Sequence, residues 1–194
     1  MRHIFCIFAK KEMRTVLYPV FVAVIGLNLC LPMQAQKKDF RDPGFKGSVA
    51  ISLQNGVMES ASAWGPGIEV SLGNMFNRNH YLGASIEFLS YFKALPHLAQ
   101  TKISVDYVAY LFSRNNTPVL GLNLGSGILT PDFKGFQPYS LFLHPAIGWS
   151  WMLPSGKGLM LNVGVTLSHP LFERDSGQTP WLQAFPRIAF AYEF

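Results

Sequence analysis

Charged residues are scarce in this chain. Of its 194 residues only 14% are charged, while 49% are hydrophobic. An ordinary soluble domain carries roughly 25% charged residues, so this composition provides little material for a surface that faces water. The abundance of apolar and aromatic residues excludes intrinsic disorder, and the length is that of one domain.

A basic balance over the whole chain is also largely missing. The formal net charge is +5 and the isoelectric point is about 9.3. Residues 1–35 hold four basic side chains and one acid, so the remaining residues carry only +2. Because no basic stripe occurs there, we expect no nucleic-acid partner.

Cysteine does not occur after residue 30. Cys6 and Cys30 both lie in the N-terminal segment, so the rest of the chain can form no disulfide and no thiolate metal site. Paired histidines at metal-binding spacing and a glycine-rich phosphate loop are absent as well. We therefore expect neither a metal site nor a cofactor.

The N-terminal segment has the order of a secretory signal peptide. Lys10, Lys11 and Arg14 precede an apolar run at residues 16–27, and the small residue Ala35 follows. This run is short of the ~20 residues that span a bilayer as a helix, so a signal peptide is favoured over a membrane anchor. We expect a helical signal peptide at 1–35, cleaved after Ala35, and a mature domain at 36–194.

Two details of this segment bear on its processing. Met13 begins a more compact signal and is an alternative start of the chain. A lipoprotein signal needs a small residue before its cysteine, but Leu29 stands before Cys30. Lipidation is therefore disfavoured.

Helical periodicity and long apolar runs are absent after residue 36. Period-two alternation recurs instead in eight segments separated by Gly, Pro, Asn, Asp and Ser, which is the pattern of strands and turns. The apolar faces of these segments run from Val49 to Leu53, Ile68 to Leu72, Leu82 to Phe88, Ile103 to Leu111, Leu120 to Leu124, Leu141 to Trp151, Leu159 to Leu167 and Leu182 to Phe194.

The two faces of the eight segments differ in chemistry. One face has no charge, and the other is small, polar and rich in glycine. A soluble up-and-down barrel of the lipocalin type would place the apolar face inside, whereas a membrane barrel places it outside. The small polar face suits a narrow lumen and suits a soluble surface poorly. We therefore predict an all-β fold: an eight-stranded antiparallel up-and-down transmembrane barrel.

The connections alternate in length. Three are short, at 77–79, 113–117 and 154–158, and four are long, at 55–66, 93–101, 129–139 and 169–181. This alternation places all short turns at one end of the barrel together with both chain termini. Bacterial outer-membrane barrels have short periplasmic turns and longer extracellular loops in the same way.

The last strand carries a recognisable pattern. Ile188, Phe190, Tyr192 and the terminal Phe194 alternate on one face. This resembles the C-terminal signature of outer-membrane β-barrel proteins, and the mature chain resembles a small porin-like barrel domain of the OmpA and OmpX type. The resemblance implies the outer membrane of a Gram-negative bacterium, contact with its lipid, and recognition of these four residues by the barrel-assembly machinery.

Two further features concern the barrel wall. Trp149 and Trp151 approach the short-turn end, and with Tyr192 they predict an aromatic girdle there. Pro145 and Pro186 lie inside strands, where each removes a ladder donor. They predict either a bulge or a ladder that has already ended on the long-loop side.

A polar cluster is expected in the lumen. If the hairpin is centred on Arg78, Glu69 faces Glu87, while Asp106 and Arg187 lie at similar heights and Lys102 lies higher. The full expected cluster is Glu69, Glu87, Lys102, Asp106, Asn123, His144 and Arg187. We interpret it as an ion-paired plug that fills the narrow interior. The alternative is a cation or proton site, because close like charges raise one pKa.

The leading functional hypothesis is a non-enzymatic barrel that contacts a partner through its long loops or contributes to envelope integrity. Small barrels also include lipid A acyltransferases and deacylases, which use His with Ser and an acid. His97, His169 and Ser176 are the candidates for such chemistry, although they lie in no matching motif. A narrow pore is a third hypothesis; a wide porin would need about 16 strands.

Overall fold

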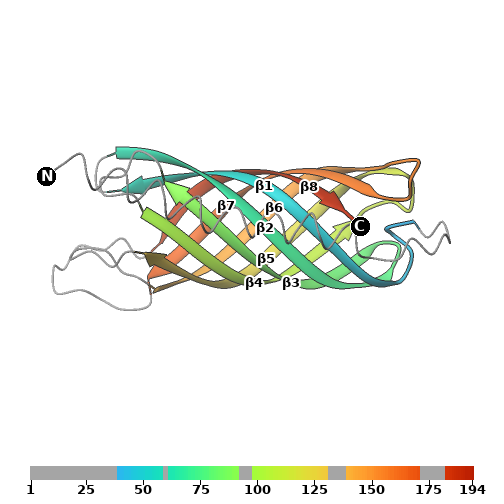
Figure 1. The fold of residues 1–194 in the computed structure, drawn as a ribbon, viewed down its shortest axis with the longest axis horizontal. Coiled ribbons are helices and arrows are strands. Elements are labelled where there is room, and N and C mark those ends of the chain that lie inside the picture. The colour runs from blue at the N-terminus through green and yellow to red at the C-terminus, as the bar shows by residue number, and fades with distance from the viewer. Residues whose placement is uncertain (1–38, 59–60, 92–97, 131–138, 171–181) are drawn as a thin grey trace, which may run out of the picture. The chain divides into compact units, whose positions relative to one another are not determined.

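Eight strands form one closed antiparallel sheet in the computed structural model, which describes residues 39–58, 61–91, 98–130, 139–170 and 182–194 (Figure 1). The strands are β1 (Gly44–Met58), β2 (Ala61–Asn77), β3 (His80–Tyr91), β4 (Leu98–Tyr110), β5 (Asn116–Thr130), β6 (Tyr139–Met152), β7 (Gly158–Pro170) and β8 (Gln183–Glu193). Each strand pairs with its sequence neighbours, and β8 pairs with β1. The predicted eight-stranded up-and-down barrel is confirmed.

The expected signal peptide at 1–35 lies outside the described residues and stays a prediction. Within the described ranges, no helix is long and apolar enough to cross a bilayer. We call the end of the barrel with the turns 78–79, 111–115 and 153–157 the turn end, and the opposite end the loop end.

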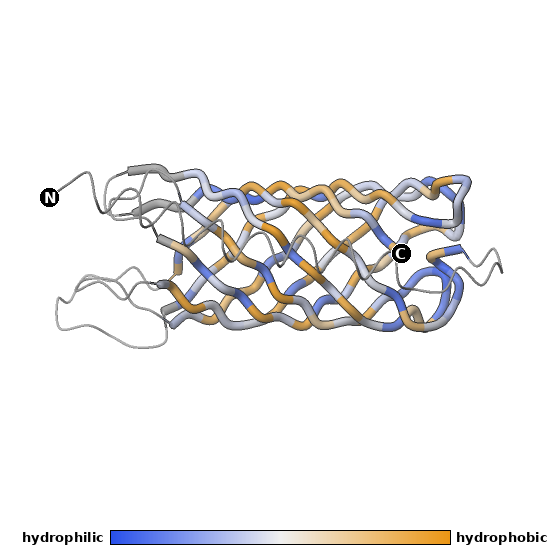
Figure 2. The backbone as a smooth tube through the Cα atoms, viewed as in Figure 1, coloured by the Kyte–Doolittle hydropathy of each residue, from blue (hydrophilic) through white to orange (hydrophobic). Residues whose placement is uncertain are grey.

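The apolar face of every strand points outward. Side chains alternate between the two faces of a strand, so one set lines the wall and the other the lumen. Ile51, Ile103 and Ile147 are more than half exposed, whereas Glu87 and Lys102 inside are almost fully buried. Hydrophobic positions run along the wall, and hydrophilic ones gather at the turns (Figure 2). This is the predicted orientation, and it is the reverse of a soluble lipocalin-type barrel.

The β2–β3 hairpin has the predicted register. Glu69 pairs with Glu87, and the register shifts only next to the turn, between Met75 and Asn77. The register places both glutamates in the lumen, because paired residues share a face.

The first loop-end connection differs from expectation. Residues 55–66 were expected to form a long loop, but β1 and β2 stay paired as far as Met58 and Ala61, which leaves only residues 59–60 between them. Gly65 and Pro66 suggest a loop in the sequence. In the barrel, Gly65 instead leaves room for the Tyr91 ring, which a Cβ at this position would meet at 2.8 Å.

Pro186 lies where one ladder has already ended. From the turn end toward the loop end, the last pair of the β1–β8 ladder is Gln54 and Arg187. Pro186 is the next residue of β8 in that direction and lies beyond this last pair. On its other side Pro186 still pairs with Val165 in an unshifted register. The expectation of an ended ladder is therefore confirmed on the β1 side.

Pro145 interrupts a ladder instead of forming a bulge. Pairing between β6 and β7 stops after Leu143 and resumes at Ala146 with the register unchanged. Neither predicted alternative holds here, because a bulge would shift the register and an ended ladder would not resume. Next to the interruption, the side chains of His144 and Thr166 are hydrogen-bonded to each other at 3.1 Å.

Candidate functional site

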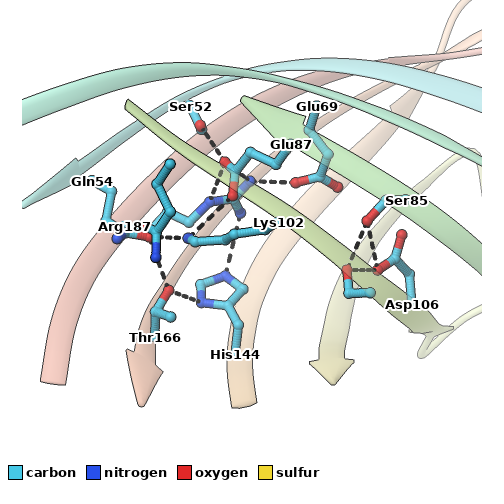
Figure 3. Close-up of polar contacts among 12 residues, drawn as sticks. Ser52, Gln54, Glu69, Ser85, Glu87, Lys102, Asp106, His144, Thr166 and Arg187 are labelled. Atoms are coloured by element: carbon cyan, nitrogen blue, oxygen red, sulfur yellow. Dashed lines mark hydrogen bonds and ion pairs between the residues drawn. The ribbon is translucent and has the colours of Figure 1, made fainter. Parts of the chain in front are cut away.

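Arg187 joins two carboxylates inside the barrel (Figure 3). From β8, its Nε and Nη2 donate to Glu87 Oε1 on β3 at 3.0 and 2.8 Å. Its Nη2 also donates to Glu69 Oε2 on β2. One guanidinium therefore bridges the two glutamates that the hairpin register places side by side, and its positive charge offsets the repulsion between them.

Lys102 on β4 neutralises the second oxygen of Glu87. Its Nζ donates to Glu87 Oε2 at 3.2 Å and to Gln54 Oε1 on β1 at 2.6 Å. The Lys102 ammonium also lies 5.3 Å from the centre of the Phe142 ring. In this group two cations face two carboxylates, so the formal charges cancel. Such compensation is what a buried ionic plug requires.

Neutral side chains extend this group around the lumen. Arg187 Nη1 lies 3.3 Å from His144 Nε2, and His144 Nδ1 lies 3.1 Å from Thr166 Oγ1. Thr166 in turn donates to Gln54 Oε1 at 3.1 Å. A neutral His144 that accepts at Nε2 and donates at Nδ1 fits this chain of bonds. We call Gln54, Glu69, Glu87, Lys102, His144, Thr166 and Arg187 the lumen ion network.

Asp106 lies apart from the lumen ion network. Its Oδ1 accepts from Ser104 at 2.8 Å and Ser85 at 3.0 Å, and its Oδ2 accepts from Ser71 at 2.8 Å. Figure 3 shows this cluster to one side of the group around Arg187. The expectation that Asp106 shares the height of Arg187 is therefore wrong.

Lys102, which was expected to lie higher, is instead level with Arg187, since both bond to Glu87. Strand tilt and stagger in a barrel shift the heights of residues that are equally far from their strand ends. Asn123, also expected in the cluster, pairs with Asp106 across β4 and β5.

Several residues that belong to the lumen ion network or bond to it were missed in the sequence. Ser52 donates to Glu87 Oε1 at 2.5 Å, and Gln54 donates to the Tyr91 hydroxyl at 2.9 Å. Ser52 and Thr166 were visible as polar positions on inward faces. Gln54 was not, because the alternating face of the predicted first strand ended at Leu53 and the long loop was expected from residue 55.

A small cavity lies between the lumen ion network and the turn end. Its volume is about 40 Å³, and Glu69, Asp106, Gly121 and Tyr110 are among its lining residues. Since one water needs roughly 10–15 Å³ by this measure, the cavity has room for about three waters. The lumen therefore contains a small pocket lined by both polar and apolar side chains. We call it the chamber.

Of the three candidates for enzyme chemistry, only His169 lies among the described residues. His97 and Ser176 lie outside the described residues. His169 is exposed on β7 and pairs with the outward-facing Leu141, whereas His144 is buried in the lumen. His144 and His169 thus lie on opposite sides of the wall.

The C-terminal pattern faces outward on β8. Ile188, Phe190 and Tyr192 are each about 40% exposed, at 42%, 42% and 38%. The Phe194 ring lies 6.2 Å from that of Tyr192, and its backbone exchanges two hydrogen bonds with Gly47 on β1. All four side chains of the expected assembly signal are therefore placed on or beside the closing strand.

Comparison with known proteins supports the fold class. No protein-family model and no curated protein matches the chain. Among solved structures, Neisserial surface protein A matches with a TM-score of 0.56 and 15% identity, over 77% of this chain and 95% of that one. This likeness shows that the chain has the fold of a small outer-membrane barrel.

Two other solved structures align less well. The outer membrane enzyme PagL gives a TM-score of 0.48 at 8% identity, covering 77% of this chain and 98% of that one. The outer membrane protein OprG from Pseudomonas aeruginosa gives 0.46 at 11% identity, covering 82% of this chain and 99% of that one.

Proposed function

We propose that this chain is an integral outer-membrane protein of a Gram-negative bacterium, non-enzymatic and non-conducting, whose loop end is its contact surface. The observation that carries the proposal is the reversal of polarity across the wall. An apolar exterior surrounds an interior in which Arg187 and Lys102 compensate Glu69 and Glu87. Lipid hydrocarbon suits the apolar outer surface of the wall, and ion pairing compensates the buried charges of its inner surface.

The exterior supports insertion into lipid. A closed barrel pairs its backbone groups and leaves no open edge, which a spanning β-structure needs in hydrocarbon. Trp149 and Tyr192 are exposed toward the turn end, and Trp64 is exposed toward the loop end. Aromatic side chains at both ends suit the two membrane interfaces. We propose that the barrel-assembly machinery reads Ile188, Phe190, Tyr192 and Phe194 on β8.

The interior supports a closed lumen. The lumen ion network connects β1, β2, β3, β4, β6, β7 and β8 through direct side-chain bonds. A path for ions would have to break several of these charge-assisted bonds at once. The barrel is therefore expected to hold its shape in the membrane without conducting.

Planar-bilayer recording tests this proposal. The purified wild-type protein is expected to insert without producing conductance steps, because the lumen ion network spans the interior. Stable steps from wild-type protein would instead support the narrow-pore hypothesis and contradict a closed lumen.

Mass spectrometry of lipid A tests the enzyme alternative. Lipid A from cells with and without the protein is expected to carry the same number of acyl chains. A protein-dependent gain or loss of one chain would show acyl-transfer or deacylase activity, and the non-enzymatic assignment would then be wrong.

A further inference from the structure

Residues 39–42, which lie ahead of β1, cross the mouth of the barrel at the turn end. We call residues 39–42 the N-terminal cap. Phe40 and Arg41 are each only 3% exposed, although they belong to no strand. Gly44, the first residue of β1, has a φ of 136°, a backbone conformation that other residues rarely adopt. The chain thus leaves β1 and bends over the opening.

The N-terminal cap contacts all three turns of this end, one residue to each turn. Phe40 N donates to Gly156 O in the β6–β7 turn at 2.6 Å. The Arg41 guanidinium donates to the carbonyls of Arg114 and Asn115 in the β4–β5 turn. Asp42 Oδ1 accepts from Arg78 Nη2 in the β2–β3 turn at 2.9 Å.

Beneath these contacts the Arg41 side chain enters the lumen. It donates to Ser150 Oγ at 3.1 Å and lies 5.0 Å from the centre of the Tyr110 ring. Tyr110 and Ser150 each donate to Glu193, at 2.6 and 3.1 Å. Burial lowers the pKa of Arg41, but a guanidinium stays charged at neutral pH. The buried cation is therefore held by carbonyls, an aromatic face and a nearby carboxylate.

Phe40 adds an apolar floor to the chamber. Its ring meets the Tyr110 ring edge to face, with centres 6.4 Å apart. Both rings line the chamber from the turn end, while Glu69 and Arg187 of the lumen ion network line it as well. The chamber thus lies between two barriers made by different parts of the chain.

We propose that the N-terminal cap closes the turn-end mouth of the lumen and isolates the chamber, in series with the lumen ion network. The inference rests on the proposed non-conducting function and deepens it, because it assigns the closure to two barriers. Loosening of the lumen ion network alone then leaves the mouth closed. Displacement of the N-terminal cap opens the chamber toward the turn end.

A single cysteine in the chamber tests the closure. Gly121 lines the chamber, and a Cβ there would meet Ala146 Cβ at 3.6 Å, an ordinary contact. The test uses the full chain with Cys6→Ser, Cys30→Ser and Gly121→Cys. The reagent is the small cation methanethiosulfonate ethylammonium, and labelling is followed by mass spectrometry on protein in detergent micelles.

The cap variant Phe40→Ala/Arg41→Ala is expected to label at least an order of magnitude faster than the parent with an intact cap. Asp42→Asn is the matched control: it loses one exposed ion pair but keeps both buried cap residues, so its chamber is expected to stay protected. Heat-modifiable gel mobility checks that each protein is folded. If the double variant does not fold, Phe40→Ala and Arg41→Ala are compared singly, and either is expected to speed labelling.

Two results would overturn the inference. Rapid labelling of the parent protein would show that the mouth is open despite the cap. Unchanged protection in folded cap variants would show that other residues close it. Neither result depends on the bilayer recording of wild-type protein, where conductance steps would refute the proposed function itself.

Discussion

Arg187 is the member of the lumen ion network that forms ion pairs with both of its carboxylates. It is 4% exposed and touches both Glu69 and Glu87, which are 14% and 6% exposed. A buried carboxylate that loses its cation keeps its desolvation cost without the compensating attraction. The stability of the interior therefore depends on which member of the network is removed.

Replacing Arg187 with methionine should strongly destabilise the barrel. The substitution keeps much of the volume but leaves two carboxylates with Lys102 as the remaining cation of the network. Removing one partner of a buried ion pair typically costs about 3–5 kcal/mol. Urea unfolding in lipid vesicles measures the change in the free energy of unfolding.

Arg114→Met is the matched control for this measurement. Arg114 is exposed in the β4–β5 turn, and the carbonyl that accepts from Arg41 belongs to its backbone, so it is retained. A surface change of this kind is expected to stay within about 0.5 kcal/mol. Equal losses for the two variants would show that Arg187 is not a buried charge partner.

The Asp42–Arg78 ion pair predicts a weak pH dependence at the turn end. The hydrogen bond from Arg78 lowers the pKa of Asp42 below its ordinary value. A lowered carboxyl pKa gives stability that is present above the unfolded-state pKa and is lost as the pH falls through the folded-state pKa. Arg78 is 55% exposed, so the pair is worth only about 0.2–1 kcal/mol.

Comparing wild type with Asp42→Asn isolates this contribution. Thermal unfolding should show wild type slightly more stable at neutral pH, with the difference vanishing once the pH falls below the folded-state pKa of Asp42. A difference that grows on acidification would have the opposite sign and would refute the assignment.

At the scale of the strands, the alternating pattern determines which side chains meet lipid. Period-two alternation and turn residues predicted the eight strands, their outward faces and the β2–β3 register. They did not predict the β1–β2 connection, because Gly65 and Pro66 have the composition of a loop while the structure uses Gly65 to accommodate Tyr91. Local composition cannot report a contact with a distant ring.

The depth of an outward residue along its strand should determine the cost of a charge there. Leu122 lies near the middle of β5 and faces outward, while Phe112 lies in a turn and is 56% exposed. Arginine at the bilayer midplane costs about 2–4 kcal/mol, falling to about 0–1 kcal/mol near the interfaces. Leu122→Arg should therefore destabilise the barrel in vesicles far more than Phe112→Arg. Similar costs would argue against a lipid-facing wall.

At the scale of the whole molecule, the features missed by the sequence depend on long-range geometry. Lys102 and Arg187 both form ion pairs with Glu87, whereas Asp106 accepts hydrogen bonds from serines. The stagger of the eight strands determines this arrangement. Phe40 and Arg41 precede the first alternating segment, so periodicity carried no information about them. Their contacts reach turns 70 or more residues away and exist only once the barrel has closed.

The central claim is that the chain is a closed barrel whose apolar wall lies in the outer membrane. Heat-modifiable gel mobility of the outer-membrane fraction tests it most directly, because a membrane barrel stays folded in detergent until boiled. The protein is expected to remain with this fraction after carbonate washing and to migrate differently before and after heating. Recovery in the soluble fraction, with one mobility regardless of heating, would contradict it.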